Sequence, residues 1–164
     1  MQRKAFTLIE IALTIFLAGI IGTLTYYYFN LSTMRKIQYK SALQSQINLV
    51  ESMVFQCKSL SEQFPKELNT STLASDTLLS ELECNTSTPY SFNGGKNGFV
   101  PIPPGEFSPY TATESGNTFF ISTSADNNST EDKALQGLII NYTPQQATLE
   151  HNATSATFKF YLSR

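Results

Sequence analysis

The sequence of 164 residues predicts an α+β protein, in which a long N-terminal helix packs on a small antiparallel β-sheet. Three observations predict this class. Ile11 to Met34 is a run of 24 residues without a charge, and residues 35–63 contain neither Pro nor Gly. The chain from residue 118 to residue 163 carries short runs in which apolar and polar residues alternate. An apolar helix that continues into an amphipathic one, followed by strands, accounts for all three.

The uncharged run is apolar enough to cross a membrane. About 20 apolar residues in a helix span the hydrocarbon core of a bilayer, and residues 11–24 are almost wholly apolar. Arg3 and Lys4 precede the run, and Glu10 stands at its start. A cleaved signal peptide and a plain single-pass anchor are two interpretations, but neither gives Glu10 a role. A carboxylate inside a membrane segment costs roughly 2.5–3.5 kcal/mol at the bilayer centre, so it normally marks function.

The segment Lys4-Ala5-Phe6-Thr7-Leu8-Ile9-Glu10 resembles the N-terminal processing signal of type IV pilins and pseudopilins. The resemblance implies that a membrane peptidase cleaves between Ala5 and Phe6 and then methylates the new Phe6 amine. Ala5 stands where that family usually has Gly. The resemblance also implies that Glu10 pairs with the Phe6 amine of a neighbouring subunit during assembly. The alternative is that Glu10 only occupies the headgroup layer near the cytoplasmic face.

The resemblance also suggests a domain organisation. It consists of a leader peptide (1–5), a transmembrane and filament-core helix (6–34), the amphipathic half of the same helix (35–64), a connecting loop region (65–118) and an antiparallel sheet (119–164). Basic residues flank the apolar run on both sides, so the positive-inside rule does not orient it. By resemblance the protein is a single-pass inner-membrane protein with its N-terminus in the cytoplasm and its C-terminal head periplasmic or extracellular.

An apolar stripe predicts how the second half of the helix packs. Its members recur at spacings of 4, 3, 4 and 3 residues: Leu43, Ile47, Val50, Val54 and Cys57. This spacing favours a helix packed on its own globular domain, and a coiled coil is the alternative. We expect the helix to end near Phe64, because Pro65 disfavours the helical conformation in the residue before it.

Strand patterns predict the remainder of the head. We expect strands over 118–124 and 138–142, and a hairpin between 147–150 and 157–162. The region before them is rich in Pro, Gly and Asn turn signals. It predicts an irregular loop with a short helix over 72–82 and a short strand over 98–102.

The two cysteines predict a disulfide in an extracytoplasmic head. Cys57 lies on the apolar stripe, and Cys84 follows the predicted short helix 27 residues later. A bridge between them would stabilise the fold by roughly 3 kcal/mol. Two buried free thiols are the alternative.

Two weaker patterns concern ligands and modification. The oxygen-rich loop with Asp126, Asn128 and Asp132 is a weak calcium candidate, but it lacks the central Gly of an EF-hand loop, and a solvated turn is the alternative. No other metal site is predicted. Asn85, Asn128 and Asn152 begin Asn-x-Ser/Thr sequons with an acid two residues earlier, which resembles the acceptor preference of bacterial N-glycosylation.

The sequence predicts a structural subunit rather than an enzyme. No catalytic motif occurs, no cofactor is predicted, and a net charge of −2 argues against a nucleic-acid binder. By resemblance, the partners are other pilin-like subunits, the prepilin peptidase, the assembly platform with its ATPase, and the inner membrane. The filament would be a type IV pilus or a pseudopilus of type II secretion or DNA uptake. The low Gly count, the head's size and the lack of a C-terminal disulfide favour a pseudopilin or minor pilin. The alternative function is a periplasmic binding module held by an uncleaved anchor.

Overall fold

A computed structural model describes residues 8–67, 73, 75–85, 90–92, 100–115 and 118–163. The chain divides into two compact units, Met1–Arg35 and Lys36–Arg164. Helix α1, Leu8–Ser61, begins in the first unit and ends in the second. In the second unit α1 is followed by a small antiparallel sheet, so the α+β class predicted from the sequence is confirmed.

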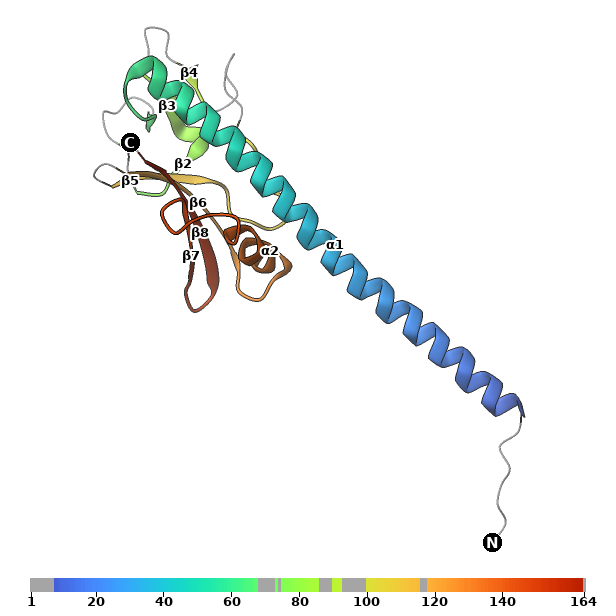
Figure 1. Cartoon of the computed structure of the whole chain (residues 1–164). Helices are drawn as coiled ribbons and strands as arrows, with labels where there is room; N and C mark the ends of the chain where they lie inside the picture. Colours follow the sequence, from blue (N-terminus) through green and yellow to red (C-terminus); the bar gives the residue numbers. More distant parts are fainter. Residues whose placement is uncertain are drawn as a thin grey trace. The chain divides into compact units, whose positions relative to one another are not determined.

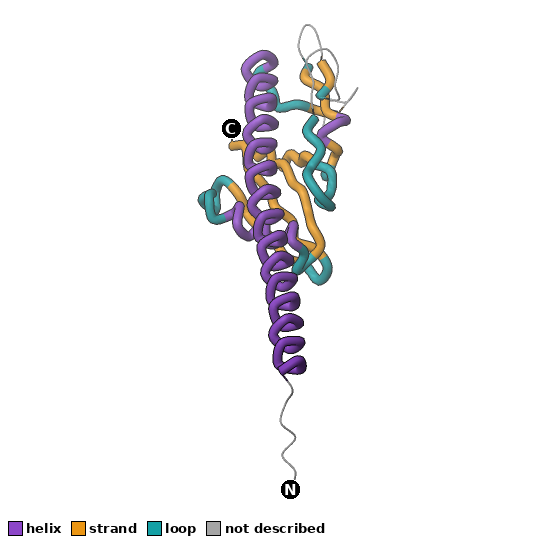
Figure 2. The backbone as a smooth tube through the Cα atoms, turned by 90° about the vertical axis from the view of Figure 1, so that its right-hand side faces the viewer, coloured by secondary structure: helices purple, strands orange, loops and turns teal. Residues whose placement is uncertain are grey.

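The main sheet of the second unit has five antiparallel strands in the order β2-β5-β6-β8-β7. Figure 2 shows the strands in orange. Its strands are β2 (Thr77–Leu78), β5 (Thr111–Ser115), β6 (Thr118–Asp126), β7 (Ala147–His151) and β8 (Ser155–Ser163). The strand predicted at 118–124 and the hairpin predicted at 147–162 are both present. A smaller sheet, in the order β1-β3-β4, contains β1 (Lys66–Glu67), β3 (Leu82–Cys84) and β4 (Tyr90–Ser91).

The core of the second unit lies between α1 and the main sheet. All five residues of the predicted apolar stripe are buried, and β8 buries alternate residues from Ala156 to Leu162. Phe64, just after α1, stacks on Phe119 of β6 with ring centroids 5.0 Å apart. The buried Tyr110 hydroxyl donates to Gln46 Oε1 on α1 over 2.7 Å, and burial raises the pKa of Tyr110. The stripe therefore packs within its own unit, as predicted.

A second helix, α2 (Thr130–Ile139), replaces the strand predicted at 138–142. The Ser129 hydroxyl caps its N-terminus by accepting from the Asp132 backbone N–H over 3.0 Å. Leu135 and Leu138 are buried on one helical face, whereas Ile140 is 81% exposed. The apolar residues that alternate over 138–142 are therefore not all buried, as they would be on one face of a strand.

The region 65–118 is also more regular than predicted. The helix predicted at 72–82 is wrong from residue 77 onward, where β2 is followed by a short 3-10 helix, Leu79–Glu81, and β3. Asp76 has a φ of 56°, which a right-handed helix does not allow. Of the strand predicted at 98–102, residues 98 and 99 lie outside the described residues, and 100–102 form no strand.

Strand β5 and the end of α1 also differ from the prediction. β5 pairs along its full length with β6, although it was predicted as loop. Helix α1 ends at Ser61, three residues before Phe64. Glu62 adopts a left-handed φ of 59°, and its N–H donates to Lys58 O over 2.8 Å. The helix therefore stops at a left-handed turn and not at the proline.

Candidate membrane and assembly segment

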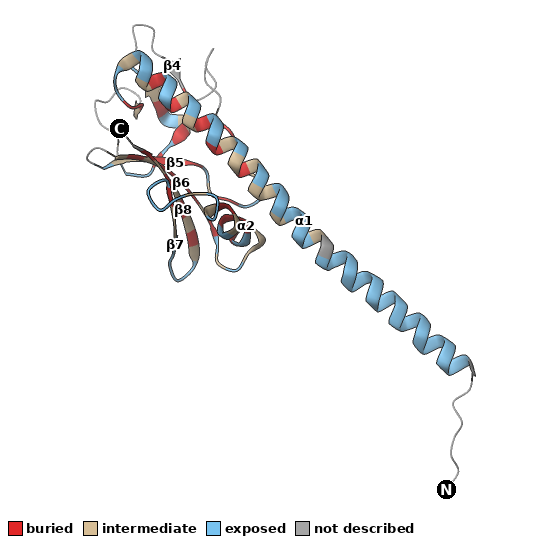
Figure 3. Cartoon of the chain, viewed as in Figure 1, coloured by how far each residue is buried: buried red, intermediate tan, exposed pale blue. Residues whose placement is uncertain are grey.

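The first unit presents apolar side chains to its surroundings all around α1. From Ile9 to Phe29 every residue of the helix is exposed (Figure 3). Within the described residues, this is the one helix long and apolar enough to cross a membrane. At about 1.5 Å per residue, residues 8–25 cover about 27 Å, close to the thickness of a bilayer's hydrocarbon core. The N-terminal part of α1 thus has the properties of a single membrane-spanning segment.

The hydroxyl groups of this segment are satisfied by its own backbone. Thr14 donates to Ile11 O over 2.8 Å, and Thr25 donates to Ile21 O over 2.8 Å. Thr23 lies within 3.0 Å of two carbonyl oxygens of the preceding turn. A hydroxyl that already donates within its helix costs much less to place in hydrocarbon, so these threonines are compatible with a bilayer.

Four consecutive aromatic residues, Tyr26 to Phe29, mark the end of the apolar part. Their exposed fractions lie between 66% and 76%. Successive residues of an α-helix are about 100° apart, so four neighbouring rings cover its whole circumference. Tyr rings, with an apolar body and a polar tip, are enriched where a bilayer meets water. Our sequence reasoning missed this aromatic belt, although the letters YYYF are its signal.

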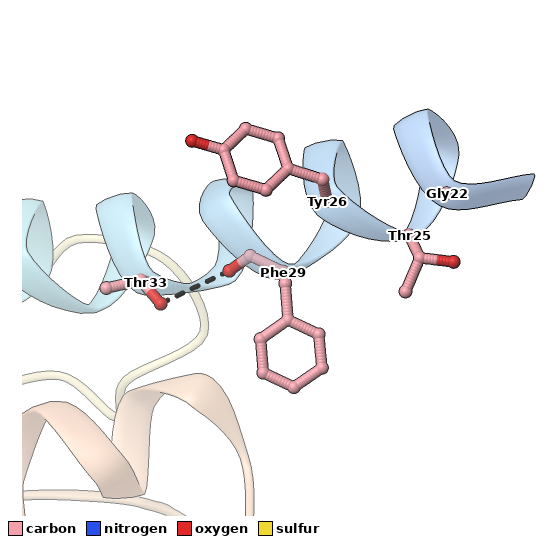
Figure 4. A pocket seen from close by; sticks show the side chains of 5 residues that line it. All are labelled: Gly22, Thr25, Tyr26, Phe29 and Thr33. Carbon is pink, nitrogen blue, oxygen red and sulfur yellow. Dashed lines mark hydrogen bonds between the residues drawn. The ribbon is translucent and has the colours of Figure 1, made fainter. Parts of the chain in front are cut away.

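A shallow groove runs along the same part of the helix. It has a volume of about 650 Å³ and is lined by Gly22, Thr25, Tyr26, Phe29 and Thr33 (Figure 4). Thr33 donates to Phe29 O over 3.2 Å, and a Cβ on Gly22 would project into open space. The groove lies on the surface of one helix and is therefore suited to contact another apolar surface.

Of the predicted processing and assembly residues, only Glu10 is described. Ala5 and Phe6 lie outside the described residues, so their cleavage and methylation stay predictions. Glu10 is exposed in the first turn of α1, four residues after Phe6 in the sequence. A carboxylate there also interacts favourably with the positive end of the helix dipole.

The structure confirms the Cys57–Cys84 disulfide and excludes the alternative of two free thiols. The two Cα atoms are 5.6 Å apart, and both residues are fully buried. The bridge joins the last turns of α1 to β3. By chain entropy, closing this 27-residue separation stabilises the fold by about 3.5 kcal/mol.

The predicted modification sites lie in different settings. Asn85 is exposed after β3, and Asn152 is exposed in the turn between β7 and β8. Asn128 has a left-handed φ of 62°, and its backbone N–H donates to Asp132 Oδ2. Glycosylation of all three stays a prediction.

Calcium binding by Asp126, Asn128 and Asp132 stays a prediction. The loop joins β6 to α2 and not to a strand, and the Asp132 carboxylate is used inside the protein. Within the described residues, no three His, Cys, Asp or Glu side chains lie together to hold a metal ion.

Asp132 and His151 form an ion pair that sequence reasoning missed. The Asp132 side chain is 3% exposed, and its Oδ1 lies 3.0 Å from His151 Nε2 at the end of β7. Burial alone would raise the pKa of Asp132. Hydrogen bonds from Asn128 N–H, His151 and Gln136, together with the His151 charge, hold it below its ordinary value. In the sequence, Ser129-x-x-Asp132 is a signal for a capped helix start.

This pair predicts a specific loss of stability in acid. A carboxyl group whose pKa is lower in the folded state stabilises the fold above its unfolded pKa of about 3.9, and this contribution disappears as the pH falls through the folded pKa. We expect Asp132→Asn to destabilise the head by about 2 kcal/mol at pH 7 and by less at pH 3. Urea unfolding of the full chain in detergent at both pH values measures this difference. Equal destabilisation at the two pH values would contradict the role of the carboxylate.

Comparisons with known proteins do not place the chain in a family. No family model matches it, and neither the curated proteins nor the solved structures contain a significant match.

Proposed function

We propose that this protein is a structural subunit of a type IV pilus-like filament or of a pseudopilus that serves type II secretion or DNA uptake. The observation that carries the proposal is the first unit. It contains a helix with apolar side chains on every side, and the first turn of this helix carries Glu10, the last residue of the prepilin-like processing signal. The Gly count of 8, the modest head and the position of the disulfide favour a pseudopilin or minor pilin.

The chemistry of assembly starts with processing. Cleavage between Ala5 and Phe6 removes the basic leader and leaves an amine on Phe6, which is then methylated. That cation in one copy pairs with Glu10 of the next copy. Both charges lie in an apolar environment, where each is penalised alone and the pair is strongly attractive. The pair therefore sets the register in which copies stack.

The exposed helix has a different partner at each stage. Before assembly the bilayer surrounds the exposed apolar residues from Ile9 to Phe29. In the filament the helices of other copies surround them, and the groove at Gly22 allows close approach. A repeated contact between different faces of successive copies produces an open helical assembly. The assembly platform and its ATPase supply the work of moving the subunit out of the inner membrane.

A photocrosslinker in the first unit tests this function. Phe16 is 66% exposed on α1, so p-benzoylphenylalanine at this position does not disturb the head. In cells that carry the peptidase and assembly machinery, illumination is expected to produce a ladder of covalent oligomers well beyond dimers. A binding module on a permanent anchor would give monomers and occasional dimers, and that result would refute the proposal.

A further inference from the structure

The stretch of α1 that follows the membrane segment carries basic residues but no acidic ones. Arg35, Lys36 and Lys40 are the charged residues of positions 11–50, and no Asp or Glu occurs there. Within the described residues of the head, Asp132 pairs with His151 and Glu150 pairs with Lys159, and neither pair uses these cations. Lys36 and Lys40 are four residues apart and therefore lie on the same face of α1.

Helix α2 holds these two lysines in place. A Cβ on Gly137 would lie 3.5 Å from Lys36 Cε and 3.8 Å from Lys40 Cδ, so both stems pass over the last turns of α2. Lys40 Nζ lies 3.5 Å from Asn141 Oδ1, just after the C-terminus of that helix. The negative end of the α2 dipole favours both ammonium groups at this position.

Apolar and hydroxyl groups complete the surface. Ile37, which follows Lys36 in the sequence, and Ile140, which precedes Asn141, are large exposed apolar residues. A groove of about 640 Å³ is lined by Ile37, Lys40, Ser41 and Asn141, among others. We call Lys36, Ile37, Lys40, Ile140 and Asn141 the basal patch. It combines ammonium and amide donors with two exposed isoleucines. This combination suits a partner surface in which a layer of anionic groups covers an apolar layer.

The aromatic belt indicates what this patch meets. Phe29, its last residue, precedes Lys36 by seven positions in the sequence. With the belt at the bilayer boundary, the short stretch of chain between Phe29 and Lys36 tethers the basal patch to the headgroup layer. A binding surface tethered so close to a membrane experiences a high effective concentration of headgroups.

We propose that the basal patch docks on anionic phospholipid headgroups and holds the head against the bilayer until the subunit leaves the membrane. Phosphate oxygens accept hydrogen bonds from the two ammonium groups, and the isoleucines enter the boundary between headgroups and acyl chains. The inference rests on the membrane insertion in the proposed function, and it adds a lipid class and a contact site in the head.

The chain contains no Trp, so one introduced Trp is an unambiguous reporter. The full chain with Ile140→Trp is reconstituted in nanodiscs of phosphatidylcholine, with or without phosphatidylglycerol, that contain a headgroup-labelled nitroxide quencher. We expect strong quenching only with phosphatidylglycerol, and its loss at high salt. The same chain with Leu60→Trp, an exposed position near the end of α1, is expected to show no quenching in either disc.

Charge variants decide whether the lysines carry the contact. Each basic residue near an anionic surface contributes about fivefold to binding, so Lys36→Gln/Lys40→Gln is expected to reduce docking about 25-fold. Lys36→Arg/Lys40→Arg keeps the charge and should retain docking. Lys58→Gln/Lys66→Gln removes the same charge near the C-terminal end of α1 and should have no effect.

The outcomes separate this inference from the proposed function. Equal quenching in both discs would overturn the headgroup contact, and so would an equal loss of docking in the two Gln double variants. In either case, a chain that co-purifies with the discs still supports the membrane span. Docking that needs an added acidic protein and not the lipid would also overturn it. A chain that does not enter the discs would overturn the span and the contact together.

Discussion

Replacement of Glu10 by Gln is expected to abolish filament assembly while processing continues. Gln keeps the size and hydrogen-bonding capacity of the side chain but removes its charge, and it leaves the Phe6 amine of the adjacent copy without a counter-ion. Breaking one member of a buried pair costs about 3–5 kcal/mol, which corresponds to roughly 150- to 5,000-fold in each association step. Since every copy in a filament makes this contact, the loss accumulates along the assembly.

The crosslinked ladder from position 16 measures this effect. In the Glu10→Gln chain the ladder should shorten to monomers, although the helix inserts at least as well, because a neutral side chain costs less in a membrane. Glu81→Gln removes an equivalent charge from an exposed head position and should leave the ladder intact. A full-length ladder in the Glu10→Gln chain would show that Glu10 only sits near the headgroups and does not set the register.

The second large effect is expected from removal of the disulfide. The Cys57→Ala/Cys84→Ala chain should lose about 3.5 kcal/mol of stability, which lowers the unfolding midpoint of a head of this size by about 10–15 °C. The smaller sheet should suffer most. Its strands β1, β3 and β4 have two, three and two residues, too few to be stable alone, and the bridge ties β3 to α1.

Thermal unfolding of the full chain in detergent, followed by circular dichroism, measures this loss. Reduction of the natural chain should lower its midpoint by the same amount, which separates loss of the bridge from the small cavity that alanine leaves. Hydrogen exchange should then show early opening of Leu82 and Cys84 relative to β6 and β8. An unchanged midpoint would mean that the packing around the bridge, and not the bridge, holds this region.

The long helix was predictable because two independent signals agree over its length. In a membrane, the uncharged run can satisfy its own backbone hydrogen bonds only as a helix. The stripe from Leu43 to Cys57 has the period of a helix that is buried on one side. Strands β6 and β8 were predictable from their own residues. In β8, buried residues such as Phe158 alternate with less buried ones, because one face of the sheet packs on the core. β6 was predictable from its aromatic and β-branched residues, although its burial alternates less regularly because Ser122 and Thr123 are also buried.

The elements that escaped prediction have cues that compete with each other. In α2, Leu138, Ile140 and Tyr142 alternate like a strand, but the cap at Ser129 and the buried carboxylate of Asp132 fix the helix start. Strand β5 has one fully buried apolar residue, Ala112, and it is a strand because β6 pairs with it. The contact of His151 with Asp132 depends on how α2 and β7 meet, which the local sequence does not encode.

The most direct test of the central claim is the intact mass and N-terminal sequence of the chain recovered from the membrane of cells that carry a prepilin peptidase. The predicted result is a chain that begins at Phe6, lacks residues 1–5 and carries one added methyl group on its α-amine. A chain that still begins at Met1 would contradict the proposal, because the Phe6 amine needed to pair with Glu10 would not exist.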